Sequence, residues 1–271
     1  MTPLAILRTT AAVLLAAMLC AITPALAQEA PRAVDIPTRS GVTQRILLMP
    51  VTDAKAVVVL FTGGNGLLRI APDGRIGTGG GNFLVRSRQL FADQGLAVAV
   101  IDAPSDRQTA PFLSGFRQTP EHAEDVKAVI AWLRQNLKLP VWLVGTSRGT
   151  QSIGSIAVRY AGTPDSPDGI VLTSTILTET TGRPVPAMAL EKLTVPVLVV
   201  HHEQDGCNLC AFSNIPSLMR KLENASRKDL QTWAGGLNVG DPCEAQAYHC
   251  YNGIEKQVVA GIGAWIRSAT P

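Results

Sequence analysis

The chain has 271 residues, with 24 Lys and Arg, 21 Asp and Glu and 4 His, which gives a formal net charge of +3 at neutral pH. A hydrophobic fraction of 46% and a charged fraction of 17% exclude an intrinsically disordered protein. The net charge is too small for a nucleic-acid surface, so we expect no nucleic-acid partner. The length allows one large α/β domain or two small ones, with a sizeable core.

The first 27 residues have the pattern of a secretory signal peptide. Arg8 supplies a positive charge, Ala11–Ile22 is an unbroken apolar run, and Pro24-Ala25-Leu26-Ala27 ends in the small-x-small pattern of a signal peptidase site. We expect cleavage after Ala27, a periplasmic or secreted protein, and residues 28–271 as a single domain without stable membrane insertion. An uncleaved N-terminal anchor is the alternative, but the run is short for a transmembrane helix.

Apolar runs of strand length recur along the rest of the chain. The predicted strands are residues 42–48, 56–61, 95–101, 141–144, 169–172 and 195–201. Continuous apolar stretches such as Val57–Leu60 and Val197–Val200 are typical of parallel strands that are buried on both faces.

Helical patterns separate these strands. Thr119-Pro120-Glu121 predicts a helix start, with a capping Thr, Pro at the first position and an acid in the first turn. Near the C-terminus, Ile254, Val258 and Ile262 repeat at helical spacing. The alternation predicts an α/β fold, with a mostly parallel central sheet and helices on both faces. The glycine-rich stretch 73–82 is expected to be a surface loop.

The motif that carries chemistry is Gly145-Thr146-Ser147-Arg148-Gly149. It lies between the predicted strand 141–144 and a helical pattern from Thr150, which is the context that a nucleophile elbow requires. Glycine is needed on both sides of the serine because a Cβ would meet neighbouring backbone in so sharp a turn. The N-terminus of the following helix favours developing negative charge. A tight turn with an incidental serine is the alternative.

With this motif in its strand–turn–helix context, the sequence resembles the α/β-hydrolase-fold serine hydrolases over nearly all of residues 28–271. It is most similar in kind to exported bacterial dienelactone hydrolase-like and esterase-like members without a large lid. The resemblance implies a triad in the order Ser, acid, His. Ser147 would be the nucleophile and His249, which precedes the last helix, the general base. Asp205, after the strand 195–201, would be the acid, with Glu203 as the alternative.

The resemblance also implies an oxyanion hole. One donor would be the backbone N–H of Arg148 and the other that of Gly64, with Asn65 as the alternative. Thr62-Gly63 stands where the family often has His-Gly. A dinucleotide loop is excluded because the third glycine of that pattern would fall on Arg69, and no phosphate-binding loop occurs in the chain.

The remaining charged candidates receive structural roles. The Arg148 side chain is expected to pair with an acid behind the elbow, and binding of a substrate carboxylate or phosphate is the alternative. His122, in the first turn of a helix, is expected to be a solvated surface residue. His201 and His202 are expected to support the site without acting as the base.

Four cysteines follow the expected signal peptide: Cys207, Cys210, Cys243 and Cys250. An even number in an exported chain favours disulfides. If Asp205 and His249 touch, these cysteines come together, and we expect the pairs Cys207–Cys250 and Cys210–Cys243 among the three pairings allowed. A redox Cys-x-x-Cys at 207–210 and a zinc site with His249 are the alternatives.

Together these features predict a serine hydrolase that cleaves an ester, thioester or amide of a small molecule or peptide, with no metal and no organic cofactor. An acyltransferase with the same triad, and a non-catalytic binding protein of the same fold, are the alternatives. The segment between Ile176 and Val195 is too short for a large lid. We therefore expect an open pocket, covered at most by the loop around residues 77–81.

Overall fold

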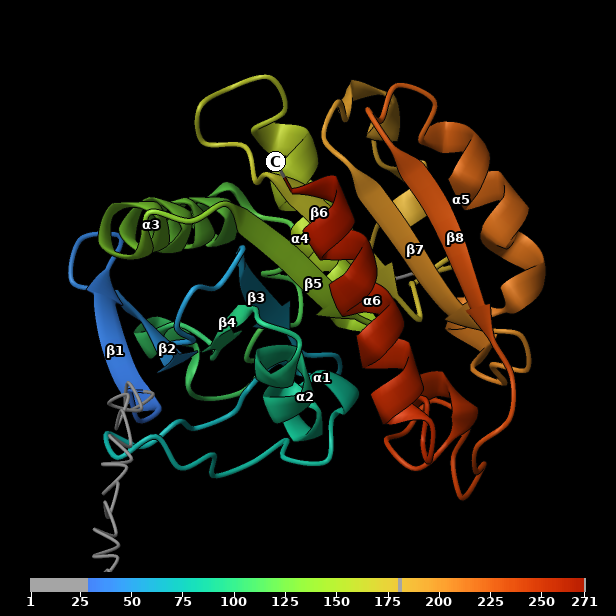
Figure 1. Cartoon of the computed structure of the whole chain (residues 1–271), viewed down its shortest axis with the longest axis horizontal. Helices are drawn as coiled ribbons and strands as arrows, with labels where there is room; N and C mark the ends of the chain where they lie inside the picture. The colour runs from blue at the N-terminus through green and yellow to red at the C-terminus, as the bar shows by residue number, and fades with distance from the viewer. Residues whose placement is uncertain (1–28, 180–181, 271) are drawn as a thin grey trace, which may run out of the picture.

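The computed structural model describes residues 29–179 and 182–270, and the expected signal peptide falls outside these ranges. Within them, eight strands form one sheet in the order β1-β2-β4-β3-β5-β6-β7-β8 (Figure 1). β1 and β4 both pair with β2 in antiparallel fashion, and every other pair is parallel. The strands are β1 (Arg32–Pro37), β2 (Thr43–Met49), β3 (Val57–Phe61), β4 (Ala97–Ile101), β5 (Val141–Thr146), β6 (Gly169–Thr173), β7 (Val197–His202) and β8 (Lys228–Trp233).

Helices cover both faces of this sheet, as Figure 1 shows for α6 in front and α4 behind. Alternate strand residues point to opposite faces, so each face has its own apolar cluster. Residues of α3, α4 and α5 pack in one cluster, and residues of α1, α2 and α6 pack in the other. The helices are α1 (Phe83–Arg86), α2 (Arg88–Asp93), α3 (Pro120–Leu137), α4 (Arg148–Arg159), α5 (Ile215–Lys221) and α6 (Glu255–Ala269). The predicted α/β architecture is confirmed.

The six predicted strands correspond to β2 to β7, with ends that differ by a few residues. The outermost strands, β1 and β8, were not predicted. Both are edge strands with many exposed or half-buried positions, so they lack the apolar runs of the central strands. α3 begins where predicted, and the Thr119 hydroxyl accepts a hydrogen bond from the N–H of His122. α4 begins at Arg148, two residues before the expected start.

The parallel arrangement decides where a site can form. The carboxyl ends of β3, β5 and β7 lie at the same edge of the sheet, and the loops that follow them therefore meet there.

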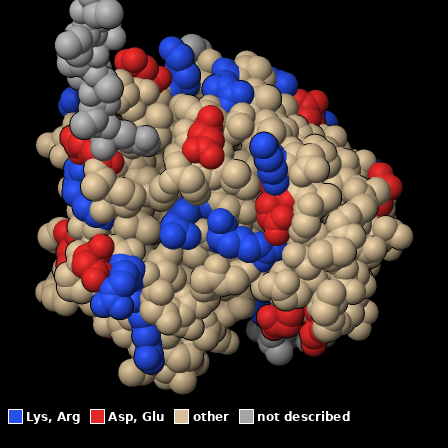
Figure 2. Space-filling model, turned by 60° about the horizontal axis from the view of Figure 1, so that its bottom comes forward, with Lys and Arg blue, Asp and Glu red and all other residues tan. Residues whose placement is uncertain are grey.

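On the face of the molecule shown in Figure 2, basic side chains lie in a row across the middle and acidic side chains lie around them. No helix within the described ranges is both long and apolar enough to cross a bilayer.

Candidate active site

Ser147 occupies the sharp turn between β5 and α4. Its backbone has φ 51° and ψ −126°, a conformation that a residue with a side chain seldom adopts. The turn is held in place from both sides: the Ser147 N–H donates to the Thr173 carbonyl of β6, and the Ser147 carbonyl accepts from the N–H and the hydroxyl of Thr150. The serine is thus fixed at the first turn of α4, as the sequence predicts.

The glycines of the motif are required by backbone crowding. A Cβ on Gly149 would lie 2.2 Å from the carbonyl oxygen of Phe61, and one on Gly145 would lie 2.8 Å from the backbone of Gly149. Both distances are far inside van der Waals contact with atoms that cannot move aside. The elbow therefore tolerates no side chain at either position, which is the reason the sequence analysis gave for the motif.

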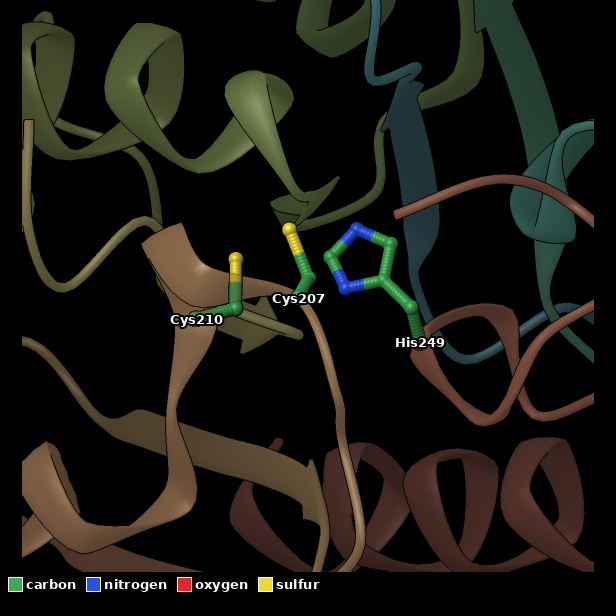
Figure 3. Close-up of side chains that lie close together, drawn as sticks. All are labelled: Cys207, Cys210 and His249. Carbon is green, nitrogen blue, oxygen red and sulfur yellow. The ribbon is translucent and has the colours of Figure 1, made fainter. Parts of the chain in front are cut away.

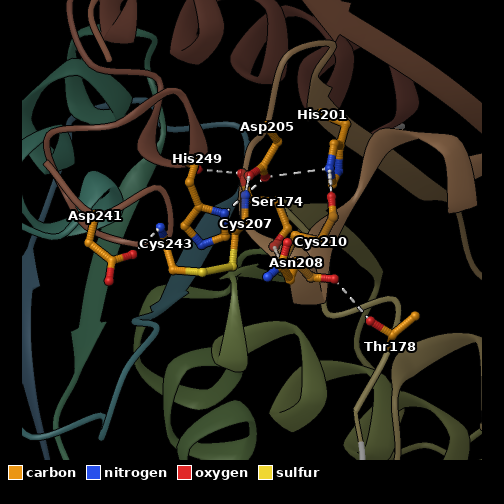
Figure 4. Close-up of a disulfide and its surroundings, with 10 residues drawn as sticks. All are labelled: Ser174, Thr178, His201, Asp205, Cys207, Asn208, Cys210, Asp241, Cys243 and His249. Atoms are coloured by element: carbon orange, nitrogen blue, oxygen red, sulfur yellow. Dashed lines mark hydrogen bonds and ion pairs between the residues drawn. A yellow bond between two sulfur atoms is a disulfide. The ribbon is translucent and has the colours of Figure 1, made fainter. Parts of the chain in front are cut away.

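Asp205 and His249 form a buried pair, although 44 positions separate them in the chain. His249 Nδ1 lies 2.9 Å from Asp205 Oδ2, and the other carboxylate oxygen accepts from the N–H of Cys207 at 2.9 Å. Figure 4 shows Asp205 between His249 on one side and His201 on the other. The alternative acid, Glu203, is exposed. The structure thus brings together the acid and the base that the resemblance implies.

His201 lies beside this pair and is buried. Its Nε2 donates to the carbonyl of Cys210 at 2.7 Å, and the same nitrogen lies 3.5 Å from Asp205 Oδ2. Desolvation on burial lowers the pKa of His201, which keeps its imidazole neutral. The residue therefore packs beside the acid as a neutral imidazole, and its hydrogen bond holds the backbone of Cys210.

His202 holds the segment that precedes the base. Its ring stacks on Tyr248 with ring centroids 4.4 Å apart, and its Nε2 donates to the carbonyl of Gly235 at 2.9 Å. The carbonyl of His249 accepts from the hydroxyl of Ser174 at 2.5 Å. These contacts fix the backbone of the short 3-10 turn Tyr248–Cys250 that carries the base.

Ser147 and His249 line the same cavity, which has a volume of about 320 Å³. Residues 62–68 of the loop after β3 form one wall, and Gly79 and Gly81 of the glycine-rich loop contribute to another. His249 Nε2 is buried and has no hydrogen-bond partner among the residues that the structure describes. Ser147 and His249 thus line one cavity, and no described group engages the second nitrogen of the imidazole.

Of the expected oxyanion donors, Gly64 and its alternative Asn65 line this cavity, and Arg148 follows Ser147 directly in the chain. A Cβ on Gly63 would lie 2.9 Å from Ser147 Cβ, so the loop after β3 lies directly against the elbow. Gly64 has φ 56°, a left-handed conformation that favours glycine. Arg148 is the first residue of α4, and the first N–H groups of a helix have no acceptor within it.

The Arg148 side chain pairs with an acid, as expected. Its Nη1 lies 2.6 Å from Glu179 Oε2, and the Glu179 side chain is almost completely buried. Glu179 belongs to the segment after β6, so the ion pair connects the start of α4 to the neighbouring strand.

The predicted disulfide pairing is wrong. Cys207 pairs with Cys243 (Figure 4). Cys210 and Cys250 are buried free thiols. Because His249 faces Asp205, the next residue along the chain points away, and Cys250 packs in the apolar cluster with α1 and α6. A disulfide does connect the loop of Asp205 to the segment before His249, as expected. It is the single bond Cys207–Cys243 and not one of the two predicted pairs.

The alternative metal site is not supported by the chemistry of its donors. Ligand atoms of Cys207, Cys210 and His249 lie within 4.8 Å of one another. Figure 3 shows these three side chains close together. A cysteine binds zinc as its thiolate, and Cys207 has no free thiol because it is bonded to Cys243. Burial raises the pKa of the Cys210 thiol, which disfavours its thiolate. His249 Nδ1 is already engaged by Asp205.

The prediction for His122 is also wrong. The side chain is only 2% exposed and packs against Phe116, with ring centroids 5.5 Å apart. Its Nε2 lies 3.0 Å from the hydroxyl of Ser152, which in turn accepts from Arg117. Desolvation, followed by repulsion from Arg117 and Arg39, lowers the pKa of His122 to about 3. The sequence gives no signal for this buried polar group, because a first-turn position on a helix does not indicate burial.

Solved structures place this architecture among known folds. The chain is similar to dienelactone hydrolase from Anabaena variabilis (TM-score 0.61, 16% identity, 90% of this chain and 100% of that one). It is also similar to an esterase from Pyrococcus furiosus (TM-score 0.62, 12% identity, 89% and 93%) and to carboxyl esterase 2 from the fungus Tuber melanosporum (TM-score 0.62, 16% identity, 90% and 88%). No protein-family model and no curated protein matches the sequence.

These similarities define the class of protein by its fold. The chain has the α/β-hydrolase fold, and the structures it is similar to include esterases and a dienelactone hydrolase. At 12–16% identity the similarity extends to the fold alone.

Proposed function

We propose that the protein is a serine hydrolase that cleaves a carboxylic ester, thioester or amide through an acyl-enzyme. Ser147 is the nucleophile, His249 the general base and Asp205 the residue that orients His249. The observation that carries the proposal is the Asp205–His249 pair at 2.9 Å, whose histidine lines the same cavity as Ser147 in its strained turn.

The proposed reaction has two halves. The Ser147 hydroxyl attacks the substrate carbonyl while its proton passes to Nε2 of His249, and the resulting imidazolium is stabilised by the Asp205 carboxylate. The N–H groups of Arg148 and Gly64 stabilise the oxyanion. Collapse of the intermediate expels the alcohol, thiol or amine, which takes the proton from His249. Water, activated by the same imidazole, then releases the acid and regenerates Ser147.

A fluorophosphonate probe tests the nucleophile without knowledge of the natural substrate. We expect the wild-type protein to be labelled on Ser147 and the Ser147→Ala variant to remain unlabelled. Ser166→Ala is a matched control, because Ser166 precedes β6 at the opposite edge of the sheet and should leave labelling unchanged. Folded wild-type protein that does not react would overturn the proposal.

We also propose that the protein acts outside the cytoplasm. The signal-peptide pattern before Gln28 supports export, and a disulfide between Cys207 and Cys243 is typical of oxidising compartments. The same labelling experiment applied to a fractionated culture tests this. The labelled protein should appear in the periplasm or medium with the mass of a chain that begins at Gln28, and a full-length labelled species in the cytoplasm would contradict it.

A further inference from the structure

Arg117 is a buried cation beside the candidate active site. It lies in the loop before α3 and is only 6% exposed. Its four hydrogen bonds to described residues all go to neutral oxygens. Nη1 donates to the Ser152 hydroxyl at 3.0 Å, and Nη2 donates to the carbonyls of Thr62 at 3.1 Å, Gly63 at 3.4 Å and Gly64 at 3.1 Å. A desolvated guanidinium is costly, so this arrangement needs an explanation.

The three carbonyls belong to consecutive residues of the loop after β3. In a trans peptide the carbonyl and the next N–H point in opposite directions. By holding the carbonyl of Gly63, Arg117 turns the N–H of Gly64 away from itself, and by holding that of Gly64 it turns the N–H of Asn65 away. These are the two N–H groups considered as oxyanion donors. The guanidinium therefore lies behind the peptide planes whose N–H groups the reaction would use.

The other end of the guanidinium reaches α4, the helix whose first residue is Arg148. Ser152 lies on α4, one helical turn after Arg148, and its hydroxyl accepts from Arg117 Nη1. The same hydroxyl lies 3.0 Å from Nε2 of the neutral His122 on α3. One guanidinium thus connects the loop that carries one expected oxyanion donor to the helix that carries the other.

The Arg117 side chain is packed so closely that residue 66 has no room for a side chain. A Cβ on Gly66 would lie 2.8 Å from Nη2 and 2.4 Å from a methyl group of Leu113. Burial, and secondarily repulsion from Arg148, lowers the pKa of Arg117 to about 9, which leaves it charged at neutral pH. A positive charge on the carbonyl side of a peptide strengthens its N–H as a donor to an anion on the other side.

We propose that Arg117 is the positioning residue of the oxyanion hole: it holds the peptides of residues 62–65 and α4 in one arrangement and polarises the donors from behind. This role rests on the proposed serine hydrolase function, and Arg117 touches no reacting atom in it. A different role would be direct binding of a substrate carboxylate, because Arg117 and Arg148 also line an adjoining cavity of about 530 Å³. The experiment separates the two.

The test compares Arg117→Lys, Arg117→Gln and Ser152→Ala with Arg134→Lys. Arg134 is the matched control, because it also donates to two backbone carbonyls, those of Pro164 and Ser166, on a connection away from the site. For each variant we would measure the melting temperature and the affinity for a boronic acid that forms a tetrahedral adduct on the serine. We would also measure kcat and KM with p-nitrophenyl acetate and with a p-nitrophenyl ester whose acyl group carries a carboxylate.

We expect both Arg117 variants to lower kcat by about 10- to 1,000-fold, which at its upper end reaches the loss of about 100- to 1,000-fold found when an oxyanion donor itself is removed. KM should change by less than about threefold, and boronate affinity should fall in parallel with kcat/KM. Ser152→Ala keeps the charge of Arg117 but removes one of its hydrogen bonds. Its kcat and boronate affinity should lie between those of the Arg117 variants and the wild type. Arg134→Lys should keep its kcat, whatever happens to its melting temperature.

Several outcomes would overturn the role. Arg117 variants that melt earlier but keep kcat and boronate affinity would make Arg117 merely structural. A loss confined to esters whose acyl group carries a carboxylate would make it a substrate-binding residue. If Arg117→Gln does not fold, Arg117→Lys and Ser152→Ala decide by the same criteria. Failure of the proposed function is distinguishable, because the wild-type protein would then neither react with the fluorophosphonate nor hydrolyse the ester.

Discussion

The Asp205 carboxylate has both of its oxygens engaged, one by His249 and the other by a backbone N–H. A buried carboxylate in this position fixes the ring orientation of its histidine and stabilises the imidazolium that forms when the serine is deprotonated. Glu203 follows the same strand two residues earlier, but it is exposed. Asp205 is therefore distinguished from Glu203 by its burial and its hydrogen bonds, and neither can be deduced from its position in the chain.

Asp205→Asn should lower kcat/KM for p-nitrophenyl acetate by about 10³- to 10⁴-fold, because an amide cannot stabilise the imidazolium and favours the wrong tautomer. The fold should survive, since the amide oxygen can still accept from the Cys207 N–H. Glu203→Gln is the control and should retain nearly full activity. Equal losses in the two variants, measured with melting temperatures alongside, would mean that Asp205 is not the orienting acid.

At the scale of elements, the site depends on a long connection between β8 and α6. Most of the residues from Ala234 to Gln246 are exposed, and none belongs to a helix or strand. The disulfide from Cys243 to Cys207 joins this connection to the loop that carries Asp205 (Figure 4). The acid and the base thus lie on two loops that are cross-linked to each other rather than on one rigid element.

Removal of this cross-link with Cys207→Ser/Cys243→Ser should lower the free energy of unfolding by about 3–4 kcal/mol, the loop-closure entropy for a separation of 36 residues. Activity should fall as well, because the base loop gains freedom relative to Asp205. Cys210→Ala is the matched control: it removes a buried thiol without opening a cross-link and should cost about 1 kcal/mol. Urea unfolding of the three proteins measures this, and equal losses in both variants would contradict a stapling role.

At the scale of the whole molecule, the inner strands β2 to β7 could be predicted from the sequence, whereas the edge strands β1 and β8 could not. The strands β3, β5 and β7 are buried on both faces, so their sequences are continuous apolar runs that indicate strands directly. β8 has only exposed and half-buried positions and reads as polar. Its place in the sheet is determined by pairing with β7, a contact that no local pattern encodes.

The candidate site divides in the same way. The elbow has a sequence signal because backbone crowding requires glycine at fixed spacing, and the chain order of the resemblance then favours Asp205 and His249 as its partners. Arg117 has no such signal, because its importance comes from packing between three segments that are distant in the chain. The cysteine pairing failed for a related reason: proximity of two loops does not say which way each side chain points.

His122 shows how such a buried group affects the stability of the entire molecule. Its pKa is about 3 in the folded protein, whereas it should be near its ordinary value of 6.5 in the unfolded chain. Above pH 6.5 both states are neutral and the residue has no effect on the pH dependence. As the pH falls below 6.5, the unfolded chain binds a proton that the folded protein does not, so stability drops by up to about 1.4 kcal/mol per pH unit until the pH approaches 3.

His122→Gln should remove this part of the acid sensitivity, at some cost in stability at neutral pH because the contact with Ser152 is altered. Between pH 7 and pH 5, urea unfolding of the wild-type protein should show a loss that exceeds that of the variant by about 2 kcal/mol. The remaining loss in the variant comes from other groups, such as His201, whose pKa is also lowered by burial. Parallel stability curves for the two proteins would mean that His122 takes up its proton without unfolding, and that the polar network beneath the oxyanion loop tolerates a second cation beside Arg117.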